Sequence, residues 1–225
     1  MNGGGLVLGV DTSTVVAVGL ARAGTVLGTA VVADRMAHVE QLTPLIKRCL
    51  ESCGHTIADL DGIVVGLGPG PFTGLRVGIV TARTLGSVLR IDVRGVCSLD
   101  VLAAQWPDRT PGADFLVATD ARRREVYWAR YDGAGQRIDG PEVSSPDDLP
   151  RLPTIGPAAD LYADRLLSAP GPRTLDPGVL AVRGSELSDA GQEPLYLRRP
   201  DAVESVRRKS VLHHRGTHHV IGGEG

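Results

Sequence analysis

A glycine- and proline-rich loop is the most distinctive segment of this sequence and a candidate anion-binding site. It runs from Gly68 to Gly78 and reads Gly-Pro-Gly-Pro-Phe-Thr-Gly-Leu-Arg-Val-Gly. The backbone N–H groups of such a loop, with the positive end of a following helix dipole, can hold phosphate or another anion. The spacing fits neither the P-loop, since no Lys-Ser/Thr pair follows the glycines, nor the dinucleotide-binding fingerprint. A tight turn that requires glycine at positive φ is the alternative explanation.

A second polar cluster, Asp11 to Thr14, directly follows the first apolar run of the chain. The favoured interpretation is that these four residues close a hairpin through side-chain bonds to their own backbone. The alternative is a vestigial nucleotide or phosphate cleft, with no catalytic residue assigned. Its predicted members are Asp11, Thr12, Ser13, Thr14, Gly68 and Gly70.

Predicted strands and helices alternate through the N-terminal half and carry these residues. Apolar periodicity predicts strands at 6–10, 15–21, 26–33, 63–67 and 91–96, helices at 38–53 and 73–89, and a further helix with Ser98 as its N-cap. The order is βββαβαβα, and the fold class is α/β with a mixed sheet.

The C-terminal half contains more turns and less regular periodicity. Strands are predicted at 115–119 and 126–131, with a chain reversal at 133–135 and a helix at 158–167. We therefore predict a first lobe over residues 1–102 that carries the dimer contacts. A second, smaller α/β lobe over 103–205 and a flexible His- and Arg-containing tail over 206–225 follow it.

Composition excludes several classes of protein. The formal net charge of −2 argues against a protein that wraps nucleic acid with its own surface, so an RNA link requires a partner or a local patch. Apolar runs are too short to span a membrane, and no signal peptide precedes the first strand, so we expect a cytoplasmic protein. The three cysteines form no CxxC pair and predict reduced, packed thiols rather than metal ligands.

Two basic or histidine-containing segments leave alternatives open. The run Arg122, Arg123 and Arg124 is most often a solvated turn, and direct RNA contact is the alternative. The histidine pairs at 213–214 and 218–219 are expected in a flexible tail, with weak metal binding as the alternative.

The motifs and the order of elements together resemble the bacterial TsaB (YeaZ) family, whose fold is that of actin, sugar kinases and Hsp70-type ATPases (the ASKHA fold). The resemblance extends from residue 6 to roughly residue 200. The matching segments are 8–14, 38–44, 66–78, 119–127, 155–157 and 194–198.

The resemblance implies a function in tRNA modification. Such proteins are partner subunits in making threonylcarbamoyladenosine, beside the anticodon of tRNAs that read codons starting with A. The implied partners are a TsaD-like catalytic subunit, a TsaE-like ATPase and, through the complex, tRNA, with a homodimer when the chain is alone. No cofactor is firmly implied for this chain, whereas ATP or ADP is implied as a ligand of the complex.

A missing motif separates a scaffold from an enzyme within this resemblance. TsaD-type chains carry a His-x3-His pair on the helix after the corresponding strand, and that pair holds a metal ion. Residues 95–102 contain no histidine here, so the resemblance implies a non-catalytic subunit without activity of its own. The alternatives are an ASKHA-type ATP-dependent phosphotransferase or nucleotide-binding protein and, with no activated Ser or Cys evident, a glycoprotease-like hydrolase.

The helix after the glycine loop predicts a subunit interface. At 100° per residue, Arg76, Arg83 and Arg90 form one exposed stripe with an apolar flank on each side, and the sheet can cover only one flank. Small residues at every fourth position from Gly74 to Gly86 would let another backbone approach, while burial of both flanks within one subunit is the alternative. The predicted interface comprises Phe72, Thr73, Gly74, Val77, Gly78, Thr81, Ala82, Leu85, Leu42, Leu45 and Ile46.

Overall fold

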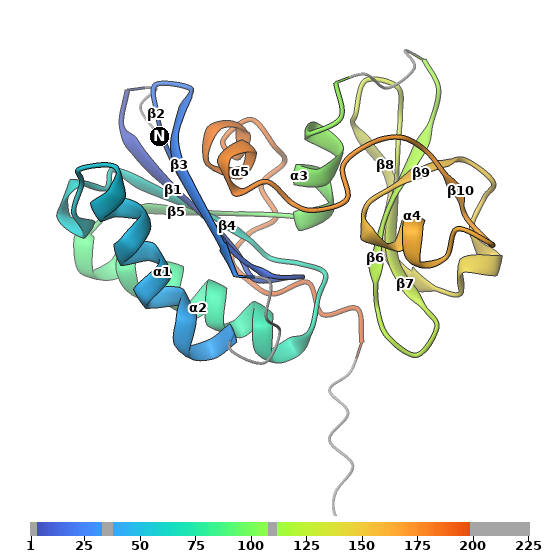
Figure 1. The fold of residues 1–225 in the computed structure, drawn as a ribbon, viewed down its shortest axis with the longest axis horizontal. Helices are drawn as coiled ribbons and strands as arrows, with labels where there is room; N and C mark the ends of the chain where they lie inside the picture. The colour runs from blue at the N-terminus through green and yellow to red at the C-terminus, as the bar shows by residue number, and fades with distance from the viewer. Residues whose placement is uncertain (1–3, 33–37, 108–111, 199–225) are drawn as a thin grey trace, which may run out of the picture.

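The computed structural model describes residues 4–32, 38–107 and 112–198. Two five-stranded sheets stand side by side, and α3 (Ser98–Ala104) and α5 (Pro177–Arg183) lie between them (Figure 1). Both helices contribute buried side chains to a core that also takes residues from each sheet. The two-lobed α/β architecture predicted from the sequence is therefore confirmed.

The first sheet combines an antiparallel meander with two parallel strands that are reached by helical crossover connections. Its order is β3-β2-β1-β4-β5, with β1 antiparallel to β2 and parallel to β4, so the predicted mixed sheet and element order are confirmed. The strands are β1 (Leu6–Asp11), β2 (Val16–Arg22), β3 (Thr25–Val32), β4 (Gly62–Gly66) and β5 (Asp92–Val96).

Two long helices cover one face of this sheet, α1 (His38–Ser52) and α2 (Phe72–Leu89) (Figure 1). Apolar residues at helical spacing turn inward from both helices and meet β1, β2 and β4 in one core. A short 3-10 turn, η1 (Ile57–Asp59), joins α1 to β4. α2 ends at Arg90, which adopts the left-handed conformation and bonds its N–H to the Gly86 carbonyl. Within the described residues, no helix is both long and apolar enough to cross a membrane.

The opposite face of the first sheet is covered by α5, which comes from late in the chain. Gly9 and Gly19 lack side chains at the place where the α5 backbone crosses the sheet, and a Cβ on Gly9 would lie 2.9 Å from the Pro177 carbonyl oxygen. Asp176 caps α5 by accepting a hydrogen bond from the Gly178 N–H at 2.7 Å. The predicted division at residue 102 separates α5 from the sheet on which it packs.

The second sheet has the order β10-β9-β6-β7-β8. Its strands are β6 (Phe115–Asp120), β7 (Val126–Tyr131), β8 (Arg137–Ser144), β9 (Pro153–Ile155) and β10 (Leu167–Ser168), with a 3-10 turn η2 (Pro146–Asp148) between β8 and β9. The predicted strands at 115–119 and 126–131 and the reversal at 133–135 are confirmed. The predicted helix at 158–167 is longer than α4 (Pro157–Leu161), which ends where Tyr162 leaves the helical region at ψ 39°.

The C-terminal part of the described chain returns between the lobes (Figure 1). The Ala190 N–H donates to the Gly95 carbonyl, and the Leu195 N–H donates to the Leu67 carbonyl, each at 2.9 Å. The chain thereby reaches the glycine loop. The predicted tail over 206–225, with its histidine pairs, lies outside the described residues.

Candidate functional site

Asp11 lies at the carboxyl end of β1 and is 1% exposed. Its Oδ1 accepts hydrogen bonds from the Ser13 N–H at 2.8 Å and the Ser13 hydroxyl at 2.6 Å. This is the local side-chain-to-backbone pattern that the favoured interpretation of residues 11–14 predicts. One carboxylate oxygen is thus committed to the turn between β1 and β2.

The second oxygen of Asp11 is committed to a distant element. Oδ2 accepts from the Ser98 hydroxyl at 2.5 Å, and the same Ser98 oxygen accepts from the Gly68 N–H at 3.1 Å. The Ser98 N–H in turn donates to the Gly68 carbonyl at 2.8 Å. Ser98 is therefore not the predicted N-cap: Cys97 holds the cap position of α3 without a side-chain bond, and the Ser98 hydroxyl ties α3 to β1.

We call Asp11, Ser13, Gly68 and Ser98 the Asp11 corner. Burial has the largest effect on the pKa of the carboxyl group in this corner. The surroundings raise the pKa of Asp11 above its ordinary value because desolvation penalises the charged form, while the bonds from Ser13 and Ser98 act in the opposite direction. A buried carboxylate with both oxygens engaged holds three elements together. It does not point a charge at an open cleft.

The glycines of the loop make room for this corner rather than for a second protein chain. A Cβ on Gly70 would lie 2.6 Å from the Ser13 carbonyl oxygen, and one on Gly74 would lie 2.7 Å from the Thr12 carbonyl oxygen. A Cβ on Gly78 would overlap the Thr12 hydroxyl. Gly68, at φ 94°, is the position where the tight-turn explanation holds.

The predicted interface is wrong at the residues that form the protein's own core. Leu42, Leu45 and Ile46 of α1 are buried against the first sheet. Gly78 and Ala82 of α2 are also buried, because they lie on the flank of α2 that packs against the chain's own core. Gly74 likewise packs against Thr12. Phe72, Thr73, Val77, Thr81 and Leu85 retain exposure, and their place in an interface stays a prediction.

The other flank of α2 has no cover among the described residues. Val80 is 60% exposed and Val88 is 74% exposed, eight residues apart on the same side of the helix. Arg76, Arg83 and Arg90 are exposed beside them, as the helical wheel predicts. We call Val80, Thr81, Thr84 and Val88 the outer face of α2.

The turn between β6 and β7 holds three arginines in an unusual backbone conformation. Arg122, Arg123 and Arg124 have φ values of 64°, 55° and 61°, a region that non-glycine residues enter at a cost of order 1–3 kcal/mol each. The Arg122 N–H donates to Asp120 Oδ1 at 2.9 Å, and the Ala121 N–H donates to the Glu125 carbonyl at 3.0 Å, so bonds at both ends hold the turn. We call residues 122–124 the arginine turn; the sequence signalled the charge of this run but not its geometry.

A cavity of about 250 Å³ lies between the arginine turn, the glycine loop and the C-terminal segment. We call it the interlobe cleft. Its lining residues are Gly70, Pro71, Phe72, Asp120, Ala121, Arg122, Arg123, Tyr127, Tyr196, Leu197 and Arg198. Gly70 is the member of the predicted vestigial cleft that reaches this cavity, and Asp11 and Ser13 lie buried behind it. The nucleotide cleft itself stays a prediction.

Aromatic rings and arginines form the wall of the interlobe cleft. The Phe72 and Tyr196 rings stack with centroids 4.8 Å apart, and the Arg76 guanidinium lies 4.4 Å from the Phe72 centroid on α2. Arg198 donates to the Ala121 carbonyl at 2.8 Å and pairs with Glu125. The C-terminal segment therefore fixes the arginine turn against the first lobe.

A buried polar cluster that no sequence pattern predicts links α3 to the second sheet. The Tyr131 hydroxyl donates to Asp100 Oδ1 at 2.8 Å, and Arg137 Nε lies 3.2 Å from the same oxygen. Burial raises the pKa of Asp100, with Arg137 opposing that shift. Burial also raises the pKa of the neighbouring Cys97 thiol to about 12. Across the described parts of the chain, no three His, Cys, Asp or Glu side chains group as metal ligands would.

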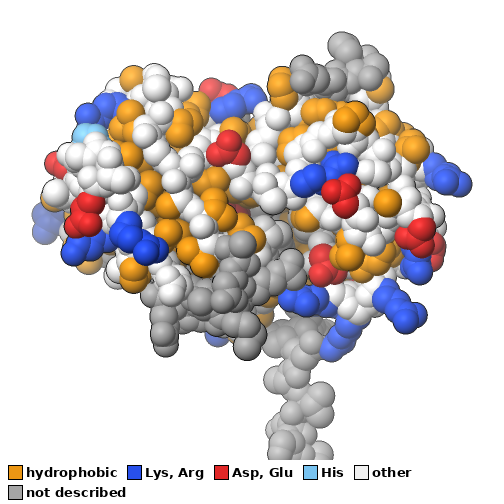
Figure 2. Space-filling model, viewed as in Figure 1, with side chains coloured by type: hydrophobic (Ala, Val, Ile, Leu, Met, Phe, Trp, Pro, Cys, Tyr) orange, Lys and Arg blue, Asp and Glu red, His pale blue; other side chains and the backbone are white. Residues whose placement is uncertain are grey.

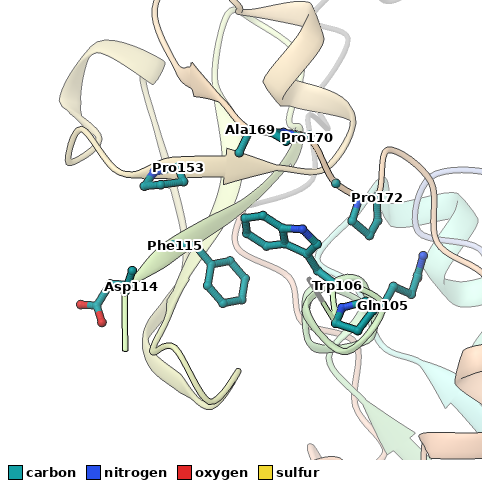
Figure 3. A pocket seen from close by; sticks show the side chains of 11 residues that line it. Gln105, Trp106, Asp114, Phe115, Pro153, Ala169, Pro170 and Pro172 are labelled. Carbon is teal, nitrogen blue, oxygen red and sulfur yellow. The ribbon is translucent and has the colours of Figure 1, made fainter. Parts of the chain in front are cut away.

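A larger cavity of about 750 Å³ lies beside α3 at the start of β6 (Figure 3). Trp106 and Phe115 meet edge to face within its wall, with centroids 5.1 Å apart, and prolines complete the rim. Its polar groups are already engaged: Asp114 accepts from Arg130, and Gln105 bonds Thr174 and Asp176. Among the lining residues that the structure describes, no polar groups converge in a way that could orient a ligand.

Comparisons with known proteins agree on one family. Residues 31–176 match the family model described as TsaD, tRNA N6-adenosine threonylcarbamoyltransferase. An uncharacterised protein of Mycobacterium tuberculosis is 47% identical over 206 residues, which are 87% of this chain and 93% of that protein. The tRNA threonylcarbamoyladenosine biosynthesis protein TsaB of Escherichia coli is 33% identical over 126 residues, 56% of this chain and 54% of that protein. The YeaZ structure from Pseudomonas aeruginosa superposes with a TM-score of 0.66 at 26% identity and covers 86% of this chain and 100% of that one.

Proposed function

The chain belongs to the TsaB (YeaZ) family, has its actin- and sugar-kinase-like fold and takes part in tRNA threonylcarbamoyladenosine biosynthesis, and from this premise we propose that it acts as a non-catalytic partner subunit. The observation that carries the proposal is the closed corner at Asp11. Both of its carboxylate oxygens bond to serines of the same chain, and the side chain is 1% exposed. A buried carboxylate whose two oxygens already accept hydrogen bonds from the same chain holds the lobe together and is shielded from a metal–nucleotide or a substrate proton.

The outer face of α2 supports the choice of a partner protein over a small substrate. Val80 and Val88 present apolar surface on a helix whose opposite flank is fully packed. Exposed apolar side chains on a rigid helix, flanked by arginines, have the composition of an interface core with a polar rim. We propose that a TsaD-like catalytic subunit docks here, and that a second copy of this chain takes its place in a homodimer when the subunit is alone.

The remaining parts of the assembly follow from the same premise. We propose that a TsaE-like ATPase joins the pair, that ATP or ADP is bound by the assembled complex, and that the modified adenosine lies beside the anticodon of tRNAs reading codons that start with A. Because the substrate is tRNA, we place the protein in the cytoplasm.

The direct test is reconstitution. The isolated chain is incubated with threonylcarbamoyl-adenylate and unmodified tRNA, alone and with the TsaD-like and TsaE-like proteins of the same organism. We expect modified tRNA only in the complete mixture. Transfer by the isolated chain that survives chelator and repeated purification would contradict the scaffold role, and tight Mg-ATP binding with phosphoryl transfer by the isolated chain would favour a phosphotransferase instead.

A double variant and a matched control test whether the outer face of α2 binds the TsaD-like subunit. Val80→Glu with Val88→Glu adds two charges to the outer face of α2 and should abolish pairing with the TsaD-like subunit in light scattering, with little change in melting temperature. Ile138 of β8 is similarly exposed, at 51%, and Ile138→Glu should leave both pairing and melting unchanged. Pairing at wild-type strength in the α2 variant would move the interface to another face.

A further inference from the structure

We propose that the interlobe cleft binds a single-stranded segment of tRNA directly, with phosphates on Arg122 and Arg123 and one base stacked on Tyr196. The inference rests on the proposed function, which brings a tRNA to the complex. It adds a contact that this subunit makes itself.

The backbone of the arginine turn is the first argument. Glycine or asparagine adopts positive φ far more readily than arginine, yet arginine occupies all three positions. Backbone groups and Asp120 hold the turn, and the Arg122 guanidinium also lies 3.8 Å from Asp120 Oδ2 while 64% of its side chain stays exposed. The run places three guanidinium groups on one short strained turn, and we take contact with a polyanion outside the turn as the reason for three arginines there.

The charge of the cleft is the second argument. Figure 2 shows Lys and Arg side chains gathered along the lower edge of the second lobe, where the β6–β7 turn lies. The acidic groups nearby are engaged: Asp120 accepts from the Arg122 N–H and lies 3.8 Å from the Arg122 guanidinium, and Glu125 pairs with Arg198. Arg122 keeps 64% of its side chain exposed. This leaves a local positive surface on a chain with a formal net charge of −2.

The aromatic shelf is the third argument. Tyr196 is 38% exposed and is supported from behind by Phe72. The Arg76 guanidinium lies over the Phe72 ring in turn, which places a positive charge beside the two stacked rings. Arginines beside an exposed ring are the combination on which single-stranded RNA stacks its bases and places its phosphates.

The size of the cleft favours a strand over a free nucleotide or a duplex. At about 250 Å³ it is smaller than the usual range for small-molecule sites, so it takes one base or phosphate and leaves the rest of a strand on the surface. Arg122, Arg123 and Arg198 are among its lining residues, and 64% of the Arg122 side chain is exposed. Exposed arginines at an opening suit a polyanion that passes across it.

The test replaces charge without disturbing the turn. Arg122→Asn with Arg123→Asn removes two guanidinium groups, and asparagine tolerates positive φ. Arg90→Asn is the matched control, because Arg90 is also an exposed arginine, with φ 58°, at the far end of α2. The full-length chain is titrated against labelled unmodified tRNA transcript by fluorescence anisotropy at several salt concentrations, with inorganic phosphate, ATP and a fully duplex RNA as competitors.

We expect the double variant to weaken tRNA binding on the order of tenfold and to lower the salt slope by about 0.7 for each lost phosphate contact. Tyr196→Ala should weaken binding without changing that slope, and Arg90→Asn should do neither. Unchanged affinity and slope in the double variant would overturn the proposal, as would equal competition by duplex RNA or full competition by ATP at equimolar concentration.

The proposed function can fail separately. If the double variant binds tRNA like wild type while the complex still forms and transfers, the cleft proposal is wrong and the scaffold role stands. If the wild-type chain fails to pair with the TsaD-like subunit, the scaffold role is wrong whatever the anisotropy shows.

Discussion

Replacing Asp11 tests whether its corner holds the fold or acts on a ligand. Asp11→Ala removes the acceptor for the Ser13 N–H, the Ser13 hydroxyl and the Ser98 hydroxyl, all in a buried site. A buried donor without a partner costs about 1–3 kcal/mol. The two hydroxyls can rotate toward other acceptors whereas the N–H cannot, so we expect a loss of about 1–3 kcal/mol in the free energy of unfolding.

The conservative variant should behave differently. Asp11→Asn keeps an oxygen for Ser13 and removes a buried charge, so its stability should lie within about 1 kcal/mol of wild type or above it. The folded protein raises the pKa of Asp11 above its unfolded value, so the folded state takes up a proton first as the pH falls. As the pH falls from the folded-state pKa of Asp11 to its unfolded-state pKa, the wild-type protein therefore gains stability. Any stability advantage of the Asn variant should be largest at neutral pH and should shrink on acidification.

Urea unfolding at neutral and acidic pH measures these differences, and the reconstituted transfer assay runs in parallel. A double-mutant cycle of Asp11→Ala with Ser98→Ala should give a coupling energy of about 1–3 kcal/mol, because the two side chains share one hydrogen bond. An Asp11→Ala protein that melts like wild type but no longer supports transfer would refute the structural role and make Asp11 a ligand-binding residue.

Three further predictions test packing and burial. Gly78→Leu should cost at least about 3 kcal/mol in folding stability, seen by calorimetry, because even its Cβ overlaps Thr12; lost pairing at normal stability would restore Gly78 to the interface. Cys97, with its pKa raised to about 12, should react with a thiol reagent at pH 8 far more slowly than the half-buried Cys53, and equal rates followed by mass spectrometry would contradict the burial of Cys97. Tyr131→Phe should lower the free energy of unfolding by about 1–3 kcal/mol, since Asp100 loses a donor; a neutral effect in urea would show that Arg137 alone satisfies that carboxylate.

The first lobe was predictable because its signals are local. The periodicity of β1 to β3, α1 and α2 lies within each segment, and the order of elements follows from reading them in sequence. The short α5 was missed because seven residues give little helical periodicity. Its start signal was present, since Asp176 is a preferred N-cap and Pro177 is favoured in the first turn.

The errors at the candidate site concern which surface a residue meets. A helical wheel identifies two apolar flanks of α2 but not which one the sheet covers, so buried Ala82 and exposed Val80 looked equivalent. The small residues of α2 signalled close approach, and the partner was the chain's own Thr12. Ser98 and Asp11 are 87 residues apart, and no local pattern joins them.

The position of α5 has a consequence for synthesis on the ribosome. One face of the first sheet is closed by residues 177–183, which pack directly over Gly9 and Gly19. At a translation rate of roughly 5–20 residues per second, α5 is synthesised on the order of ten seconds after the first strands of the sheet. During this interval the nascent sheet presents a smooth, glycine-lined apolar face that must be shielded from other chains. A message that stops before codon 183 therefore yields an open sheet prone to aggregation, and translation through α5 is the step that completes the N-terminal lobe.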